Sequence, residues 1–203
     1  LKLFGYEVRE KFTNGDGYYP AFFLYKDYII FSPINSITRL NSRNFIYMLI
    51  KKHGKLFDDK ISKHLEPNLI LQTCSLFKKI PSIIIKEGRH WGKGEFDILI
   101  YSPKDNLVFH VQAKGTIPPE GSRLTRNLEA RMIEGIEQFS KFDRLPAVRQ
   151  DKILTGFIGM KVEKPTIINV LLGWSGFGTY RVWEKINSGK IMALNPSLMN
   201  TYI

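Results

Sequence analysis

Two short apolar runs separated by a turn-forming segment lie near the middle of this 203-residue chain. The runs cover residues 96–101 and 107–111, and residues 102–106 between them read Ser-Pro-Lys-Asp-Asn. Apolar runs on either side of a segment rich in Pro, Asp and Asn predict a β-hairpin. Because a strand has a side-chain period of two, this hairpin determines which side chains of the segment share a face.

The alternation places polar groups on one face of the second strand. That face carries Val108, His110, Gln112 and Lys114, and the opposite face is wholly apolar, with Leu107, Phe109, Val111 and Ala113. On the first strand, the residues expected to share a face are Glu95, Asp97, Leu99 and Tyr101. Asp97, Gln112 and Lys114 all lie near the strand ends far from the turn, so the hairpin register can bring them together.

A carboxylate, an amide oxygen and an ammonium group at one place suit metal-assisted hydrolysis of a phosphodiester. Mg²⁺ prefers oxygen ligands and keeps several waters. Asp97 would supply a charged ligand, Gln112 its amide oxygen and Ala113 its backbone carbonyl. Lys114 would orient or deprotonate the attacking water and offset charge on the phosphorane. The same pattern also fits an ordinary amphipathic hairpin whose polar face is only hydrated.

The segment that runs from Asp97 through the turn to Val111-Gln112-Ala113-Lys114-Gly115 resembles the PD-(D/E)xK nuclease superfamily. It is most similar to the Mrr-like branch of restriction and defence nucleases, in which Gln replaces the acidic residue of the second motif. The resemblance spans about residues 43–160 and is sharp only in the hairpin. Residues 92–96, Gly-Lys-Gly-Glu-Phe, stand where Mrr-like proteins often carry Asp-Gly repeats.

The resemblance implies a restriction-endonuclease-like α/β fold, with a mixed central sheet flanked by helices. It also implies that Asp97 and Gln112 bind Mg²⁺, for which Mn²⁺ can substitute, and that Lys114 is catalytic. The superfamily usually contributes a further glutamate from a helix ahead of the hairpin. Glu66 is the candidate for this catalytic and metal-binding role, with Asp59 as the alternative, and Glu66 also fits a solvated carboxylate at a helix end.

The charge balance indicates a polyanionic partner. The formal net charge is +11 and the isoelectric point is about 9.7. Such values favour nucleic acid first and an anionic membrane surface second. We expect DNA, with RNA not excluded, to be held by cations in the Gly-rich segment before the hairpin and on a long helix after it. These are Lys86, Arg89, Lys93, Arg123, Arg126 and Arg131. A solvated loop is the alternative for the first three.

Periodicity outlines the rest of the chain. Strands are expected over residues 3–12, 18–25, 28–32, 82–86, 153–160, 166–172 and 180–184, the first three forming an antiparallel meander. Helices are expected over residues 42–52, 56–65, 67–79 and 122–142, with a short helix or coil after Pro196. The helix over 122–142 has the strongest apolar stripe, formed by Leu124, Leu128, Met132, Ile136 and Phe139. This outline predicts a β-rich subdomain over 1–40, an α/β core over 41–175 and a C-terminal extension over 176–203 packed on the core.

The cysteine content and hydropathy suit a cytoplasmic protein that does not cross a membrane. Cys74 is the single cysteine, so the chain has no internal disulfide. No apolar run approaches the length of a membrane span. Because the chain starts at Leu1 without a signal-like pattern, we expect a fragment or processed form of a longer, multidomain protein. A homodimer is plausible, since cutting both strands needs two sites.

Three classes of function follow from these observations. The first is a Mg²⁺-dependent endonuclease acting on DNA in restriction, defence or DNA processing. The second is a non-catalytic nucleic-acid-binding module with a nuclease-like fold. The third, an adaptor for membrane surfaces or acidic proteins, rests on net charge alone.

Overall fold

The computed structural model of the chain describes residues 6–7, 22–31, 33, 46, 50, 53–117, 122–174 and 176–202. The chain forms two compact units, one of residues 1–64 with 120–123 and one of residues 65–119 with 124–203. The expected N-terminal subdomain lies within the first unit, and the expected C-terminal extension lies within the second. The boundaries expected at residues 40 and 175 stay predictions.

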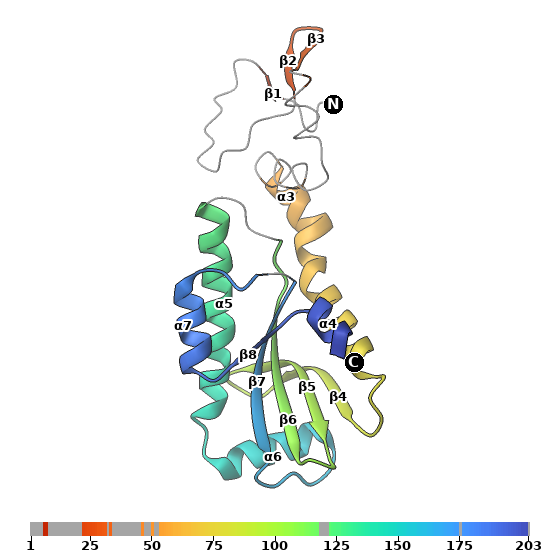
Figure 1. Cartoon of the computed structure of the whole chain (residues 1–203), viewed down its shortest axis with the longest axis vertical. Coiled ribbons are helices and arrows are strands. Elements are labelled where there is room, and N and C mark those ends of the chain that lie inside the picture. The colour runs from red at the N-terminus through yellow and green to blue at the C-terminus, as the bar shows by residue number, and fades with distance from the viewer. Residues whose placement is uncertain are drawn as a thin grey trace. The chain divides into compact units, whose positions relative to one another are not determined.

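A five-stranded mixed sheet forms the centre of the second unit (Figure 1). In spatial order its strands are β4 (Ile84–His90), β5 (Glu95–Ser102), β6 (Leu107–Lys114), β7 (Thr166–Gly173) and β8 (Met192–Leu194). Strands β4, β5 and β6 pair antiparallel, whereas β6–β7 and β7–β8 pair parallel. The α/β class expected from the sequence, a mixed sheet flanked by helices, is confirmed.

The predicted hairpin is formed by β5 and β6. Their register pairs Ile98 with Val111 and Ser102 with Leu107. In the turn, the Ser102 hydroxyl donates to Asp105 at 2.7 Å, and Asn106 takes the left-handed backbone conformation with φ of 47°. Asn tolerates this conformation better than most residues, which explains why the chain turns here.

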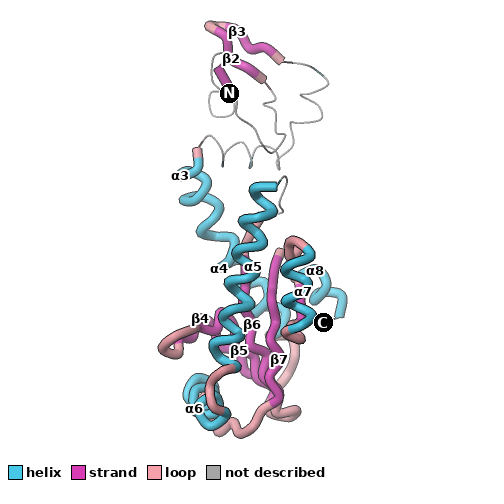
Figure 2. Tube along the Cα trace, turned by 90° about the vertical axis from the view of Figure 1, so that its left-hand side faces the viewer, coloured by secondary structure: helices cyan, strands magenta, loops and turns pink. Residues whose placement is uncertain are grey.

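Helices cover both faces of the sheet (Figures 1 and 2). On one face, α4 (Lys63–Phe77) and α8 (Pro196–Tyr202) pack on the odd-numbered apolar residues of β6 and the even-numbered ones of β5. On the other face lie α5 (Ser122–Asp143), α6 (Ala147–Ile158) and α7 (Tyr180–Ser188). The strand β6 is therefore enclosed by a neighbouring strand on each edge and by helices on each face.

The apolar stripe predicted for the long helix is confirmed as core. Leu128, Met132, Ile136 and Phe139 of α5 are buried. They pack with Leu171 of β7 and with Val182 and Ile186 of α7. Residues three or four apart lie on one side of a helix, so a single stripe can contact both elements.

Three predictions in the C-terminal half were wrong. Residues 153–160 were predicted as a strand but lie mostly in α6, and residues 180–184 lie in α7. The buried pairs Leu154–Ile158 and Val182–Ile186 are four residues apart, which is the spacing of a helix. The short edge strand β8 was not predicted. Its three residues are too few to show an alternating pattern.

The two helices expected over residues 56–65 and 67–79 form one continuous helical segment. It consists of α3 (Gly54–Phe57), a π-helical stretch η1 (Asp58–Ser62) and α4. Pro67 lies inside α4 rather than near a helix start, so the Lys63 carbonyl has no helical N–H at that position. Gly54 begins α3, although it was expected to end the preceding helix. Of that helix, expected over 42–52, only Ile46 and Ile50 are described, and both are helical.

In the first unit, three short strands form a small sheet. They are β1 (Tyr6–Glu7), β2 (Phe23–Tyr25) and β3 (Tyr28–Ile30). The predicted antiparallel pairing and the Lys26-Asp27 turn are confirmed for β2 and β3. The pairing of β1 with β2 is parallel, so the expected meander does not extend to β1. Of the other residues of the expected strands, Phe22 and Phe31 are described and lie just outside β2 and β3, and the rest lie outside the described part of the chain.

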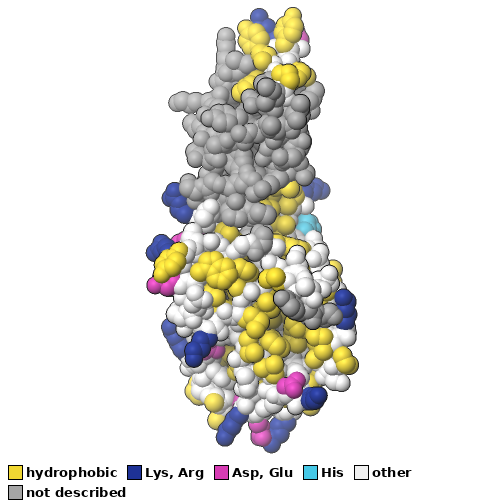
Figure 3. Space-filling view, viewed as in Figure 1, with side chains coloured by type: hydrophobic (Ala, Val, Ile, Leu, Met, Phe, Trp, Pro, Cys, Tyr) yellow, Lys and Arg dark blue, Asp and Glu magenta, His cyan; other side chains and the backbone are white. Residues whose placement is uncertain are grey.

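The surface shows how the basic residues are distributed. On the face seen in Figure 3, Lys and Arg side chains are spread along the edges, and hydrophobic side chains gather between them. The net charge of +11 is therefore not concentrated in a single patch on this face.

Candidate active site

The hydrogen-bonded ladder between β5 and β6 ends at the pair Ile98–Val111, and Asp97 is the next residue outward. Here a side chain replaces the backbone as the hydrogen-bond acceptor between the two strands, because Asp97 Oδ2 accepts a hydrogen bond of 2.7 Å from the Ala113 N–H. Asp97 is only 8% exposed. The side-chain alternation also breaks here. Phe96 packs in the same cluster as Leu99 and Tyr101, whereas strict alternation would place it on the opposite face. The carboxylate is thus directed at β6, between positions 112 and 114.

Gln112 is completely buried, and its amide has a defined orientation. The Nε2 group donates to the Glu95 carbonyl at 2.7 Å and lies 3.4 Å from Nε2 of His110. The Oε1 atom has no hydrogen-bond partner among the described residues. The same is true of four other buried atoms, and an acceptor of this kind can be satisfied by a water molecule or a bound ion; the atoms are Thr73 Oγ1, Trp91 Nε1, His110 Nδ1 and Asn169 Oδ1.

The His110 ring lies next to the Gln112 amide. The ring is buried and packs edge-on against Phe96, Phe139 and Phe142. Burial lowers its pKa to about 3, although a hydrogen bond to the Glu95 backbone opposes this shift. His110 is therefore neutral at physiological pH.

Lys114 lies on the same face of β6 as Gln112, with only 8% of its surface exposed. Its stem runs along α5 at Gly135, where an added Cβ would lie 3.2 Å from Lys114 Cε and 3.5 Å from Cγ. A glycine at this position of α5 therefore leaves room for the lysine side chain to lie against the helix.

The charges around Asp97 identify its neighbours. The Asp97 pKa is raised from 3.8 to about 6, chiefly by burial and to a smaller extent by the nearby Glu66 and Glu95 carboxylates. The Lys114 ammonium and the Ala113 N–H oppose that rise, because both stabilise the ionised form. Asp97, Lys114 and Glu66 thus share one electrostatic environment, as the sequence predicted for the first two.

Glu66 reaches this region because α4 approaches β6 unusually closely. A Cβ added to Gly115 would lie 2.2 Å from the Glu66 backbone nitrogen, so only glycine fits at the end of β6. The Gly115 N–H is 3.4 Å from Glu66 Oε2. Glu66 was expected at the end of one helix but lies in the first turn of α4. The alternative, Asp59, forms an exposed ion pair with Lys63 instead.

The residues at this position suit a hard divalent cation. The unpaired Gln112 Oε1 is a neutral oxygen ligand, and a nearby cation would favour the ionised form of the Asp97 carboxylate. Within the described ranges, no three His, Cys, Asp or Glu side chains converge to hold a metal ion. A metal ion at this position would need the Gln112 amide oxygen in addition to carboxylates, and the ligand set expected from the sequence stays a prediction. Ala113, the further expected ligand, is buried, and its N–H is bonded to Asp97.

The expected nucleic-acid-binding residues lie apart from this cluster. Arg89 and Lys93 are exposed on β4 and in the β4–β5 turn, Lys86 is half-buried on β4, and Arg126 and Arg131 are exposed on α5. None of these five contributes to the Asp97 pKa shift. The Arg123 side chain lies outside the described residues. Trp91, in the same turn as Lys93, is buried against Phe96 and Phe142.

Three contributors to the site were missed by sequence reasoning. They are the Glu95 carbonyl, which orients Gln112, and the two glycines, Gly115 and Gly135, at which helices approach β6. The glycine directly after Lys114 was a signal that a backbone passes close by, since glycine permits such an approach. Gly135 was a weaker signal, as a glycine inside a strongly patterned helix usually has a packing reason.

No known family model matches the chain, and no curated protein matches it either. Among the described helices, none combines the length and the apolar character that crossing a bilayer requires.

Proposed function

We propose that this protein is a Mg²⁺-dependent nuclease that hydrolyses DNA phosphodiester bonds, acting as an endonuclease in restriction, defence or DNA processing. The observation that carries the proposal is the Asp97 carboxylate bonded to the Ala113 N–H, between Gln112 and Lys114 on β6, with the Lys114 ammonium close enough to lower the Asp97 pKa. The cytoplasm is the proposed compartment, because DNA is present there and the single Cys74 needs no oxidising environment.

Each residue has a distinct role in this proposal. Asp97 and Gln112 would hold Mg²⁺, with Glu66 and the Ala113 carbonyl as further ligands. The bound ion would polarise the scissile phosphate and acidify a water molecule. Lys114 orients that water and balances the negative charge that develops on the phosphorus oxygens. Arg126 and Arg131 would contact the phosphate backbone, which gives affinity without reading sequence.

The decisive test is nicking of supercoiled plasmid by Lys114→Ala, with Lys141→Ala as the control. Lys141 is an exposed lysine of α5 that contacts Gln138. We expect Lys114→Ala to lower the cleavage rate by about 10²–10³-fold or more, because it removes a charge-stabilising group. DNA binding measured in EDTA should stay nearly unchanged. Full activity in Lys114→Ala would refute the assignment, and normal cutting by Asp97→Ala would place the metal elsewhere.

A non-catalytic nucleic-acid-binding module is the second candidate. It is favoured by the bonds that both carboxylates already accept from the backbone, Asp97 from Ala113 within the sheet and Glu66 from Gly115 between α4 and the end of β6, which give them a structural role without a metal ion. This candidate predicts DNA binding without cleavage, at any Mg²⁺ concentration.

A further inference from the structure

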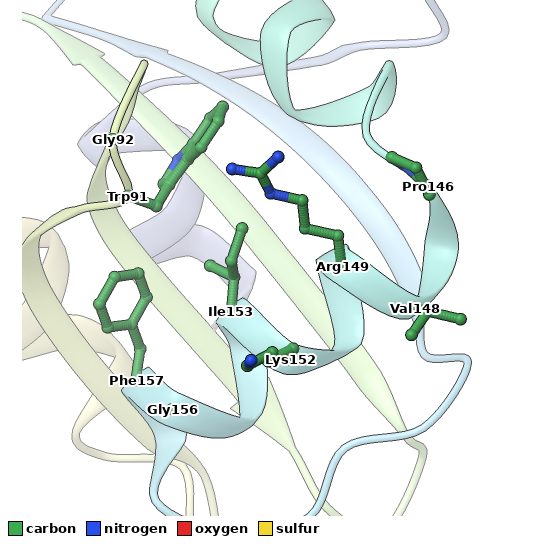
Figure 4. Close-up of a pocket in the computed structure, with 9 residues that line it drawn as sticks. All are labelled: Trp91, Gly92, Pro146, Val148, Arg149, Lys152, Ile153, Gly156 and Phe157. Atoms are coloured by element: carbon green, nitrogen blue, oxygen red, sulfur yellow. The ribbon is translucent and has the colours of Figure 1, made fainter.

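A pocket of ≈ 770 Å³ lies between α6 and the β4–β5 turn (Figure 4). Ile153 and Phe157 of α6 supply an apolar floor, and Trp91 faces them from the turn. The Trp91 ring is held by Phe96 and Phe142 behind it, so this wall is rigid. The volume lies within the range of pockets that bind small organic groups.

Two basic side chains, Arg149 and Lys152, line this pocket. Figure 4 shows the Arg149 side chain directed toward Trp91, and Lys152 follows one turn later on α6. Neither has an ion-pair partner within the described part of the chain, and none of the 9 lining residues is acidic. An apolar floor bordered by unpaired cations fits a ligand that carries both a flat apolar group and an anion.

Gly156 gives an independent indication that the space is kept open. It lies inside the 12-residue helix α6, where glycine is less stable than alanine by roughly 0.5–1 kcal/mol. A Cβ added there would have no atom within 4 Å, and the backbone does not need a positive φ. No packing or conformational reason for this glycine exists among the described residues. It does, however, leave the floor of the pocket unobstructed.

The pocket is connected to the candidate active site through aromatic contacts. The Trp91 and Phe96 rings are 6.3 Å apart, and the Phe96 and His110 rings are 4.5 Å apart. His110 in turn lies beside Gln112. Gly92 and Asp97 are five positions apart in the sequence, which corresponds to at most about 17 Å of extended chain.

We propose that this pocket binds one unpaired nucleotide of the nucleic-acid strand next to the point of cleavage. Its base lies against Ile153 and Phe157, and its phosphate contacts Arg149 and Lys152. A base can reach such an apolar floor only after it leaves the duplex stack, so the preferred substrate is single-stranded or locally unpaired. The inference rests on the proposed function for the identity of the polymer, and it names the class of substrate.

The test measures binding of the full chain in EDTA, where no cleavage occurs. Fluorescence anisotropy is recorded with a labelled short oligothymidylate, an abasic strand of equal length and a duplex, all at one salt concentration. Two variants act on the pocket. Gly156→Leu fills it, and the double variant Arg149→Ala/Lys152→Ala removes its cations. Gly156→Ala is the control for the first and Lys78→Ala/Lys79→Ala, which loses the same charge elsewhere, for the second.

We expect both pocket variants to weaken oligothymidylate binding about tenfold relative to their controls, as loss of one stacked base would. The wild-type protein should bind the abasic strand more weakly than oligothymidylate, and Gly156→Leu should remove this difference. The proposal is overturned if Gly156→Leu binds oligothymidylate like Gly156→Ala, if the abasic strand binds equally well, or if polyglutamate competes as effectively as oligothymidylate. Absence of any oligothymidylate binding overturns it as well.

Failure of the pocket proposal and failure of the nuclease proposal give different results. Loss of cleavage chemistry with intact pocket effects supports a binding module that takes unpaired strands. If plasmid is nicked normally but Gly156→Leu binds oligothymidylate like Gly156→Ala, the nuclease proposal stands and only the pocket proposal is overturned.

Discussion

On the face of the sheet covered by α4, β6 presents Val111 and Ala113, whereas on the face covered by α5 it presents His110, Gln112 and Lys114. Both faces are buried to a similar degree. The α4 face of the sheet is an apolar cluster, and the α5 face of β6 carries polar groups; buried polar atoms without a partner among the described residues occur on both sides, as Thr73 Oγ1 in α4 and as Gln112 Oε1 and His110 Nδ1 in β6. The two faces of β6 therefore differ in the kind of side chain that they bury, and the polar ones on the α5 face include Gln112 and Lys114 of the candidate site.

The largest expected effect is a difference in the free energy of unfolding between a variant on the α4 face and a variant on the α5 face. Leu172→Ala on the α4 face should lower the free energy of unfolding by about 2–5 kcal/mol, because it leaves a cavity in a closed cluster. Gln112→Leu on the α5 face should change it by less than about 1 kcal/mol, since an unpaired acceptor is removed together with one hydrogen bond. Urea denaturation of the two variants measures both values.

The same pair can be examined with Mg²⁺ present. The ion should raise the Tm of the wild-type protein and of Leu172→Ala, but not that of Gln112→Leu, because only a ligand that binds the native state stabilises it. A loss in Gln112→Leu as large as that in Leu172→Ala would mean that Gln112 is a structural residue.

The next effect concerns the pH dependence of stability. The pKa of Asp97 is raised from 3.8 to about 6 in the folded protein, so the folded state binds this proton more tightly than the unfolded state. The stabilisation from the protonated form is complete below pH 4 and is lost as pH rises through 6. The expected loss is about 3 kcal/mol. In Asp97→Asn this part of the pH dependence should disappear, which denaturation midpoints across that range will show.

Cleavage should show the opposite dependence on pH. Because the ionised Asp97 is the form that would bind Mg²⁺, activity should rise as pH passes through about 6. A higher Mg²⁺ concentration should move this rise to lower pH. A pH profile that does not respond to Mg²⁺ would argue against Asp97 as a ligand.

The smallest effect compares the two glycines at which helices approach β6. Gly115→Ala would place a methyl group against the Glu66 backbone, which cannot easily move, and should cost about 1–3 kcal/mol of stability. Gly135→Ala meets the ends of two side chains, Leu171 at 2.9 Å and Lys114 at 3.2 Å. It should cost less than about 1 kcal/mol and mainly displace Lys114, so its cleavage rate falls more than its stability. Equal losses of stability in both variants would contradict this distinction.

The central hairpin and the class of the fold could be predicted from local sequence patterns. The alternation over 107–114 and the turn at 102–106 determine the register, and the register places Asp97 beside Gln112 and Lys114. The contact of Glu66 with Gly115 joins residues 49 apart, and no local pattern encodes such a contact. The helix α6 was mistaken for a strand because a short apolar run satisfies either period. Because α6 was not predicted, the pocket that Arg149 and Lys152 border was not predicted either.

The strand β6 is hydrogen-bonded along both edges, to β5 on one side and to β7 on the other. Backbone amides in such a central strand exchange with solvent deuterium only when the sheet itself opens. Gln112 and Lys114 lie beyond the last β5–β6 pair, Ile98–Val111, but both remain paired with β7, so they are released only when the β6–β7 ladder opens. A partly unfolded form in which only α6 has unfolded would still hold the Gln112 and Lys114 side chains on a folded strand.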